Sequence, residues 1–145
     1  MQSTMATQPG YYYNQSAVIP FLVEDGEYRI VLVTTRKGKS WTLPKGIVEP
    51  GMTAPESAAM EAEEEAGIKG HVEQVMFDWF QYDKWGGTCT VKVYLMYVKN
   101  FQDRWEEDHI RERRLFSPEE AIQWVGRKEI RSVLQKFVYH VTADY

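Results

Sequence analysis

The sequence predicts an α/β protein with a mixed β-sheet and helices on the faces of that sheet. Short runs rich in Val, Ile, Tyr and Thr alternate with turn residues, a strongly marked helix occupies residues 54–66, and apolar residues recur at helical spacing near the C-terminus. The resulting order is β-β-β-α-β-β-β-α-α. Because 145 residues suffice for one sizeable core, we expect a single domain over residues 1–145.

Composition and charge limit the classes of function. The net charge of −4 provides no overall basic field, so we expect neither nucleic acid nor a membrane as partner. Cys89 is the only cysteine, which excludes an internal disulfide and a Cys-based zinc site and suits a reducing compartment. With no signal-peptide pattern and no apolar run of membrane-spanning length, we expect a cytoplasmic protein.

The first part of the chain is expected to form three strands. Residues 1–10 are polar and are expected to be loosely ordered, and Tyr11–Tyr13 are expected to lead into the first strand. Asp25 and Gly26 are a strong hairpin signal between the first two strands. The expected strands cover residues 16–23, 28–35 and 41–43.

The central helix carries clear start and stop signals. Thr53 and Glu56 form a capping box, and Pro55 stands in the first turn, where its missing N–H costs little. Gly67 is the expected residue after the C-terminal end. These signals predict a helix over residues 54–66.

The remaining part is expected to return to the sheet and to finish with two helices. Ser117 and Glu120 form a second capping box, and the helix that they begin is expected to end near Gly126. Apolar residues at helical spacing predict a final amphipathic helix from Ile130 to Val141. The expected strands cover residues 72–80, 88–98 and 112–116, with a turn at 82–87.

The central helix also carries an unusual concentration of carboxylates, namely Glu61, Glu63, Glu64 and Glu65. Like charges at this spacing repel, and the helix dipole disfavours negative charge in the C-terminal half. Glu61, Glu64 and Glu65 are spaced i, i+3, i+4, so they share one face, whereas Glu63 points elsewhere. Three converging carboxylates suit Mg²⁺ or Mn²⁺, although a solvated acidic face is the alternative for a bare acidic run.

The stretch LPKGIVEPGMTAPESAAMEAEEEAGI resembles the sequence box of the Nudix (MutT-type) hydrolases, G-x5-E-x7-R-E-U-x-E-E-x-G-U. With Gly46 as the first glycine, the closing half of the box matches at Glu61, Glu64, Glu65 and Gly67. The resemblance implies a Nudix-type α/β/α sandwich and metal-dependent hydrolysis of a phosphoanhydride, such as a nucleoside diphosphate linked to another group. It also implies that Glu61, Glu64 and Glu65 are catalytic metal ligands, with the Gly46 carbonyl as a further ligand.

Two positions depart from the box. Met52 stands where the family has its first Glu, and Met60 stands where it has Arg. In the family that Arg orients the catalytic carboxylates, and Met cannot make a charge-assisted hydrogen bond. Loss of a group that orients metal ligands typically costs ~10–100-fold in affinity or activity. Glu56 and Arg36 are candidates to compensate.

The general base is either one of the helix carboxylates or a glutamate from a facing loop, where Glu106 and Glu107 are the candidates. Basic residues crowd the entrance to the glycine loop and the segment before the second helix. If both groups face the metal, they suit a highly phosphorylated ligand; if they point outward, they are solubilising charge. The expected substrate-binding residues among them are Arg36, Lys39, Lys45, Arg111 and Arg113.

The segment WEEDHIRERRLFSPEEAIQWV also resembles the Nudix subgroup that cleaves diphosphoinositol polyphosphates and dinucleoside polyphosphates. The matching features are Trp105, Glu106, Arg111, Arg113, Phe116 and Glu119–Glu120. Aromatic residues around a predicted hairpin could instead hold a nucleobase by stacking, although core packing is the default for the first two. These aromatics are Trp79, Phe80, Tyr82 and Trp85.

Three hypotheses for function follow. The first is an active Nudix phosphoanhydride hydrolase that acts on a small molecule. The second is a Nudix-fold binding or regulatory module, which Met52 and Met60 favour. The third is an RNA 5′-pyrophosphohydrolase, against which the acidic net charge weighs. Because Nudix proteins are often dimers, a homodimer is also compatible with the resemblance.

Overall fold

The computed structural model describes residues 14–84 and 86–143. The expectations for residues 1–10, for Tyr11–Tyr13 and for Trp85 therefore lie outside the described residues. The strands are β1 (Asn14–Glu24), β2 (Glu27–Thr34), β3 (Trp41–Thr42), β4 (Lys45–Ile47), β5 (Ile68–Val72), β6 (Asp78–Lys84), β7 (Gly87–Phe101) and β8 (Arg113–Phe116). The helices are α1 (Ala54–Ala66), α2 (Pro118–Trp124) and α3 (Lys128–Thr142).

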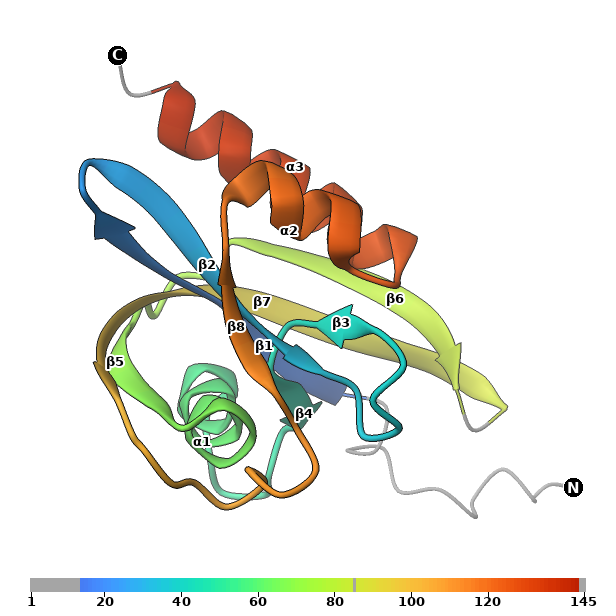
Figure 1. The fold of residues 1–145 in the computed structure, drawn as a ribbon. Helices are drawn as coiled ribbons and strands as arrows, with labels where there is room; N and C mark the ends of the chain where they lie inside the picture. The colour runs from blue at the N-terminus through green and yellow to red at the C-terminus, as the bar shows by residue number, and fades with distance from the viewer. Residues whose placement is uncertain (1–13, 85, 144–145) are drawn as a thin grey trace, which may run out of the picture.

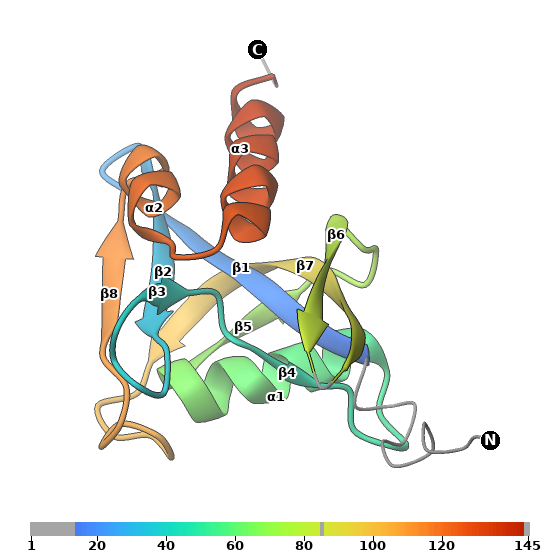
Figure 2. The same ribbon diagram turned by 90° about the vertical axis from the view of Figure 1, so that its right-hand side faces the viewer.

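The strands form one mixed sheet between two layers of helices. The main order is β3-β2-β1-β7-β5, while β4 pairs with β1, β6 with β7 and β8 with β2. The central pair, β1 and β7, is parallel, and the other pairs are antiparallel. Helix α1 lies on one side of the sheet, and α2 and α3 lie on the other (Figures 1 and 2). The predicted fold class, an α/β/α sandwich with a mixed sheet, is confirmed.

The alternation of side chains along the central strands divides the core between the two faces. Val18 of β1 packs toward α1, whereas Ala17 and Ile19 pack toward α2 and α3. On the α1 side, the small residues Ala58, Ala62 and Ala66 are fully buried. Small side chains let α1 approach the sheet closely, so the opposite face of this short helix is held at a defined place.

Two features of the sheet differ from the prediction. The single strand expected over residues 72–80 is wrong, because β5 and β6 are separate strands that pair with different parts of the long strand β7. The polar pair Glu73 and Gln74 interrupts the alternation between them. The prediction also missed β4, a three-residue strand that contains Gly46 and pairs with β1. Among the described residues, no helix is both long and apolar enough to cross a membrane.

Candidate active site

Helix α1 begins and ends where its sequence signals predict. Thr53 N donates to the Glu56 carboxylate at 2.9 Å, and Glu56 N donates to the Thr53 hydroxyl at 3.2 Å. Gly67 has φ of 63°, a left-handed conformation that glycine adopts without strain. Because its carboxylate is occupied in the cap, Glu56 is not the compensating group considered above for Met60.

One face of α1 opens into a pocket of about 900 Å³. Glu61, Glu64 and Glu65 all line this pocket, as their spacing predicts. Glu63 lies outside the pocket lining and pairs with Lys69 at 3.6 Å. The i, i+3, i+4 argument therefore separates the three grouped carboxylates from the fourth correctly.

Strand β4 packs directly against the carboxylates. Lys45 N donates to the Glu65 carboxylate at 3.2 Å. The Glu61 carboxyl group occupies the space in which a Cβ at Gly46 would stand. Only glycine at position 46 leaves room for Glu61 in this place, so the first glycine of the box has a packing role beside the carboxylates.

The crowding of acids changes their proton affinity. Burial, together with the nearby Glu65, raises the pKa of Glu61 to about 8. Burial also raises the pKa of Glu65, against the opposing effect of the Arg111 guanidinium. The interaction with the Glu65 carboxyl group contributes to the raised pKa of Glu61. A bound divalent cation would neutralise this repulsion, and hard carboxylate oxygens are the ligands that Mg²⁺ and Mn²⁺ prefer.

The segment between β7 and β8 brings two further carboxylates to the helix. Oxygen atoms of Glu64, Glu106 and Glu107 lie within 4.8 Å of one another, which is close enough to hold one metal ion. Glu107 is nearly buried, with 12% of its side chain exposed, and it accepts a hydrogen bond of 2.6 Å from Arg111. The structure thus places both loop candidates, Glu106 and Glu107, beside the helix carboxylates.

This segment is attached to α1 through the backbone carbonyls at the C-terminal end of the helix. A helix leaves its last carbonyls without partners inside the helix, and unpaired carbonyls are costly when buried. Here the segment and the first residue of β8 donate to four successive carbonyls. The pairs are Glu107 N to Glu64 O at 3.0 Å, Trp105 Nε1 to Glu65 O at 2.9 Å, Arg113 Nη1 to Ala66 O at 2.9 Å, and Gln102 N to Gly67 O at 2.8 Å.

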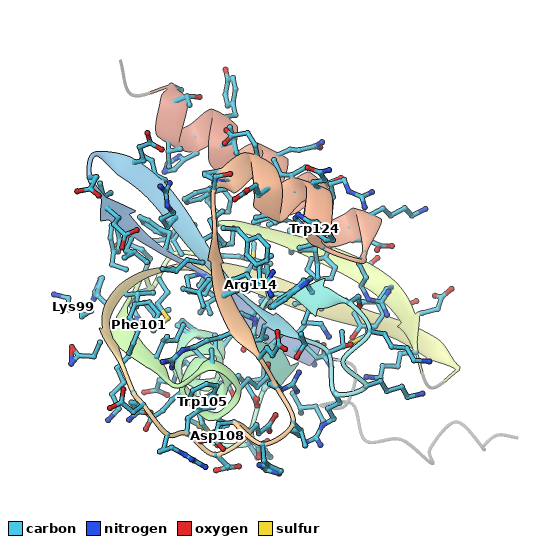
Figure 3. The ribbon with its side chains drawn as sticks, viewed as in Figure 1. Lys99, Phe101, Trp105, Asp108, Arg114 and Trp124 are labelled. Carbon is cyan, nitrogen blue, oxygen red and sulfur yellow. The ribbon has the colours of Figure 1, made fainter. Side chains whose placement is uncertain are left out.

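Two of the expected substrate-binding residues do not reach the pocket. The Arg113 guanidinium lies 4.2 Å from the centre of the Trp105 ring and 5.2 Å from that of Phe101, so it belongs to the cap of α1. Figure 3 labels Phe101 at the end of β7 and Trp105 on the segment that follows it, with Trp105 over α1. Lys39 is absent from the pocket lining, whereas Arg36, Lys45 and Arg111 are part of it.

The pocket also has a cationic region. Lys45 Nζ donates to the Tyr82 hydroxyl at 3.2 Å, and that hydroxyl donates to Gln15 at 3.0 Å. The Arg127 guanidinium lies 3.9 Å from the centre of the Tyr82 ring. Burial lowers the pKa of Lys45 to about 8, with help from the nearby Lys84. In the described part of the chain, neither Lys45 nor Arg127 forms an ion pair with a carboxylate.

Sequence reasoning missed Arg127, since it lies two residues beyond the end of the second matched segment. Its position depends on the junction of α2 and α3, where Gly126 N donates to the Trp41 carbonyl at 3.1 Å. Of the aromatics considered for stacking, Tyr82 lines the pocket, whereas Phe80 is buried in the core. Trp41 also lines the pocket and was not considered for this role.

Comparisons with known proteins agree with this geometry. The model of the NUDIX domain family matches residues 13–139. Nudix hydrolase 4 of Arabidopsis thaliana is 31% identical over 118 residues, which cover 80% of this chain and 56% of that protein. The asymmetrical bis(5'-nucleosyl)-tetraphosphatase of Sus scrofa is 33% identical over 102 residues, which cover 66% of this chain and 68% of that protein.

The similarity extends to solved structures. The crystal structure of a C. elegans Ap4A hydrolase binary complex superposes with a TM-score of 0.77 at 23% identity, covering 90% of this chain and 98% of that one. At this identity the likeness concerns the fold. The chain spans a little over half the length of the curated plant relatives that it matches.

Proposed function

This chain belongs to the NUDIX family, and we propose that it is a metal-dependent hydrolase of a phosphoanhydride bond in a dinucleoside polyphosphate. A diphosphoinositol polyphosphate is the second substrate class. The observation that carries the proposal is one pocket that combines three helix carboxylates with the cations Lys45 and Arg127. Carboxylates that gather a metal ion, together with cations that face the same space, suit a chain of phosphates.

We assign the metal to Glu61, Glu64, Glu65 and the carbonyl of Gly46, with Mg²⁺ or Mn²⁺ as the ion. The donor set fits such an ion, since every ligand is a hard oxygen, and burial, together with neighbouring carboxylates, raises the pKa values of Glu61 and Glu64. The ion would neutralise phosphate charge and lower the pKa of a bound water. The chain's own contribution is to hold the carboxylates at one side of the pocket.

The general base is assigned to the segment before β8. Glu107 accepts a hydrogen bond from Arg111 and lies 3.6 Å from Arg36, so its carboxylate is held in place and suits a ligand or orienting role. Glu106 makes no hydrogen bond or ion pair with the described residues and lies beside Glu64. Glu106 is therefore the better fit for accepting a proton from water, and the catalytic role expected of Glu107 stays a prediction.

Three cations are assigned to the substrate phosphates. Arg36, Lys45 and Arg127 line the pocket from β2–β3, β4 and the α2–α3 junction. Arg36 has 68% of its side chain exposed and is able to swing toward a ligand. Trp41, which also lines the pocket and is only partly buried, offers an aromatic face for a nucleobase. A dinucleoside polyphosphate uses both kinds of group, which is why we favour it over an inositol substrate.

A substrate panel with matched variants tests this proposal. The purified protein is incubated with Mg²⁺ or Mn²⁺ and with dinucleoside polyphosphates, diphosphoinositol polyphosphates, nucleoside diphosphate sugars or 5′-triphosphate RNA, and phosphate-containing products are separated. We expect turnover of the first class, loss of at least ~100-fold in Glu64→Gln and Glu65→Gln, and near-normal rates in Glu63→Gln. Glu63 is the matched control because it stands on the same helix but outside the pocket.

The other hypotheses predict different results from the same panel. Ligand binding without turnover of any member would support the binding module that Met52 and Met60 favour. Turnover of RNA alone would support the pyrophosphohydrolase. Turnover that persists in both Glu64→Gln and Glu65→Gln would overturn the metal assignment. Cytoplasmic location and a homodimer stay predictions, checked by fractionation and by light scattering.

A further inference from the structure

We propose that Arg111 is a positioning residue, whose guanidinium holds the helix carboxylate Glu65 and the loop carboxylate Glu107 in one arrangement. It thereby supplies from the segment before β8 the orienting cation that residue 60 lacks. This inference rests on the proposed function for its kinetic readout. The expectation that Arg111 binds substrate is the alternative, which the kinetic test below distinguishes.

All parts of the Arg111 guanidinium are engaged by the protein. Nε donates to the Glu107 carboxylate at 2.6 Å, and Nη1 donates to the Thr34 carbonyl at 2.8 Å. Nη2 lies 3.6 Å from the Glu65 carboxylate. Only 9% of the side chain is exposed. A guanidinium with three protein partners and so little exposure is held in one orientation, which suits a positioning role.

The backbone around Arg111 is fixed to the sheet. Thr34 N donates to the Glu112 carbonyl at 3.1 Å, and Glu112 N donates to the Thr34 hydroxyl at 3.0 Å. Thr34 is the last residue of β2, so these bonds attach the residue after Arg111 to the end of a central strand. The guanidinium is consequently a rigid link between β2, α1 and the segment that carries Glu107.

The surroundings of Met60 explain why a link from elsewhere is needed. Met60 lines a small hollow together with Glu63, Glu64, Gln102 and Glu106. Its thioether cannot donate a hydrogen bond, so α1 itself provides no cation beside its carboxylates. The two pairs made by Arg111 are its only ion pairs with carboxylates among the described residues, and both partners line the large pocket.

The substitution Arg111→Lys tests the proposal, because Lys keeps the charge but cannot bridge three acceptors. We expect kcat to fall by ~10–100-fold while the KM for the polyphosphate changes by less than about threefold. The dissociation constant for Mn²⁺, measured by titration without substrate, should rise by about tenfold. Arg131→Lys is the matched control, since the Arg131 guanidinium also donates to backbone carbonyls, at Ile122 and Val125, but lies outside the pocket.

A second substitution examines residue 60 directly. Met60→Arg should change kcat by less than about threefold in the wild-type background and should partly restore kcat in Arg111→Lys. A tenfold gain in the wild-type background would show that the site still lacks an orienting cation, and would overturn the proposal. If Arg111→Lys raises the KM and leaves kcat unchanged, Arg111 binds substrate and the positioning role is overturned.

The metal titration separates this proposal from the proposed function. If the wild-type protein turns over no substrate but Mn²⁺ binding weakens in Arg111→Lys and not in Arg131→Lys, the hydrolase assignment fails and the positioning role stands. If the Arg111→Lys variant keeps the Mn²⁺ affinity and the kcat of the wild-type protein, the positioning role is overturned. Thermal unfolding of each variant identifies any that loses the fold, and Arg111→Met then serves as the second variant at this position.

Discussion

The indole Nε1 of Trp105 donates a hydrogen bond of 2.9 Å to the backbone carbonyl of Glu65, forty positions earlier in the chain. The same ring lies so close to Gly67 that a Cβ there would come within 2.8 Å of it. Trp105 therefore satisfies a carbonyl at the end of α1 and closes over the glycine that ends the helix. The position of the neighbouring loop carboxylates depends on this contact.

Trp105→Phe should loosen the attachment of the segment that carries Glu106 and Glu107 to α1. Phe retains most of the ring packing but removes the donor to the Glu65 carbonyl, which then lacks a partner. We expect a loss of about 1–3 kcal/mol in the free energy of unfolding and a fall in kcat of about tenfold. Urea unfolding and steady-state kinetics measure both. Trp124→Phe is the control, because Trp124 is 56% exposed on α2, and equal effects in the two variants would contradict the role of the bond.

Gly46→Ala should displace a metal ligand while the fold is retained. The added Cβ would occupy the space of the Glu61 carboxyl group, which is the movable end of a side chain. The φ of Gly46 is not positive, so the backbone accepts alanine without strain. We expect Mn²⁺ affinity to fall by about tenfold, with a change in unfolding free energy below about 1 kcal/mol. Unchanged Mn²⁺ affinity in isothermal titration would exclude Glu61 as a ligand.

Glu61→Gln should stabilise the metal-free protein at alkaline pH. The pKa of Glu61 is raised from 4.5 to about 8, so between these values the native state binds more protons than the unfolded state. Stability of the wild-type protein then falls as pH rises through this window, and the full cost is present above pH 8. Because Gln is neutral throughout, we expect the variant to gain about 1–3 kcal/mol at pH 8.5 and nothing near pH 4.5.

Urea unfolding in EDTA at several pH values measures this difference. Added Mg²⁺ should remove it by compensating the carboxylate charges in the wild-type protein. Parallel stability curves for the two proteins across pH 4.5–8.5 would show that Glu61 titrates normally.

Arg127→Met should weaken the binding of long polyphosphates in particular. Arg127 precedes α3 without a side-chain capping bond, so its removal leaves the helix start unchanged. A lost charge-assisted contact to phosphate is worth about 1.5–3 kcal/mol, which corresponds to a rise in KM of about 10–100-fold. We expect this rise for a dinucleoside tetraphosphate, a smaller one for a triphosphate, and similar kcat for both. Lys128→Met, at a neighbouring residue outside the pocket lining, is the control.

The bounds and the acidic face of α1 could be predicted from local sequence signals. The capping box of Thr53 and Glu56 and the glycine at 67 predicted its bounds, and the structure has the same bounds. Its acidic face was also predictable, because residues three and four apart share a side of any α-helix. By contrast, residues 72–80 were read as one strand, since no local pattern shows that two segments pair with different parts of β7.

The basic residues were less predictable than the acidic ones. Arg111 and Arg113 are two positions apart, yet one contacts the pocket carboxylates and the other caps α1 against Trp105. Arg127 stands just after the second matched segment, which ends at Val125, and reaches the pocket because the α2–α3 junction packs on β3. The partners of a long, flexible Arg or Lys side chain depend on the groups that the fold places near it. The spacing of these residues in the sequence therefore does not determine which groups they bind.

The sequence alone therefore determined the family, the α/β/α class, the bounds of α1 and the carboxylates that share its inner face. The family follows from the resemblance to the Nudix box, whereas the bounds of α1 and its acidic face depend on local propensity and on helix periodicity, which involve only neighbouring residues. The tertiary structure decided which cations face those carboxylates, that Glu106 and Glu107 lie beside them, and that Arg111 links helix to loop. The contacts from the segment before β8 to α1 join residues 40 or more positions apart, and the physical reason that they form is the shared need of buried carbonyls and charges for partners.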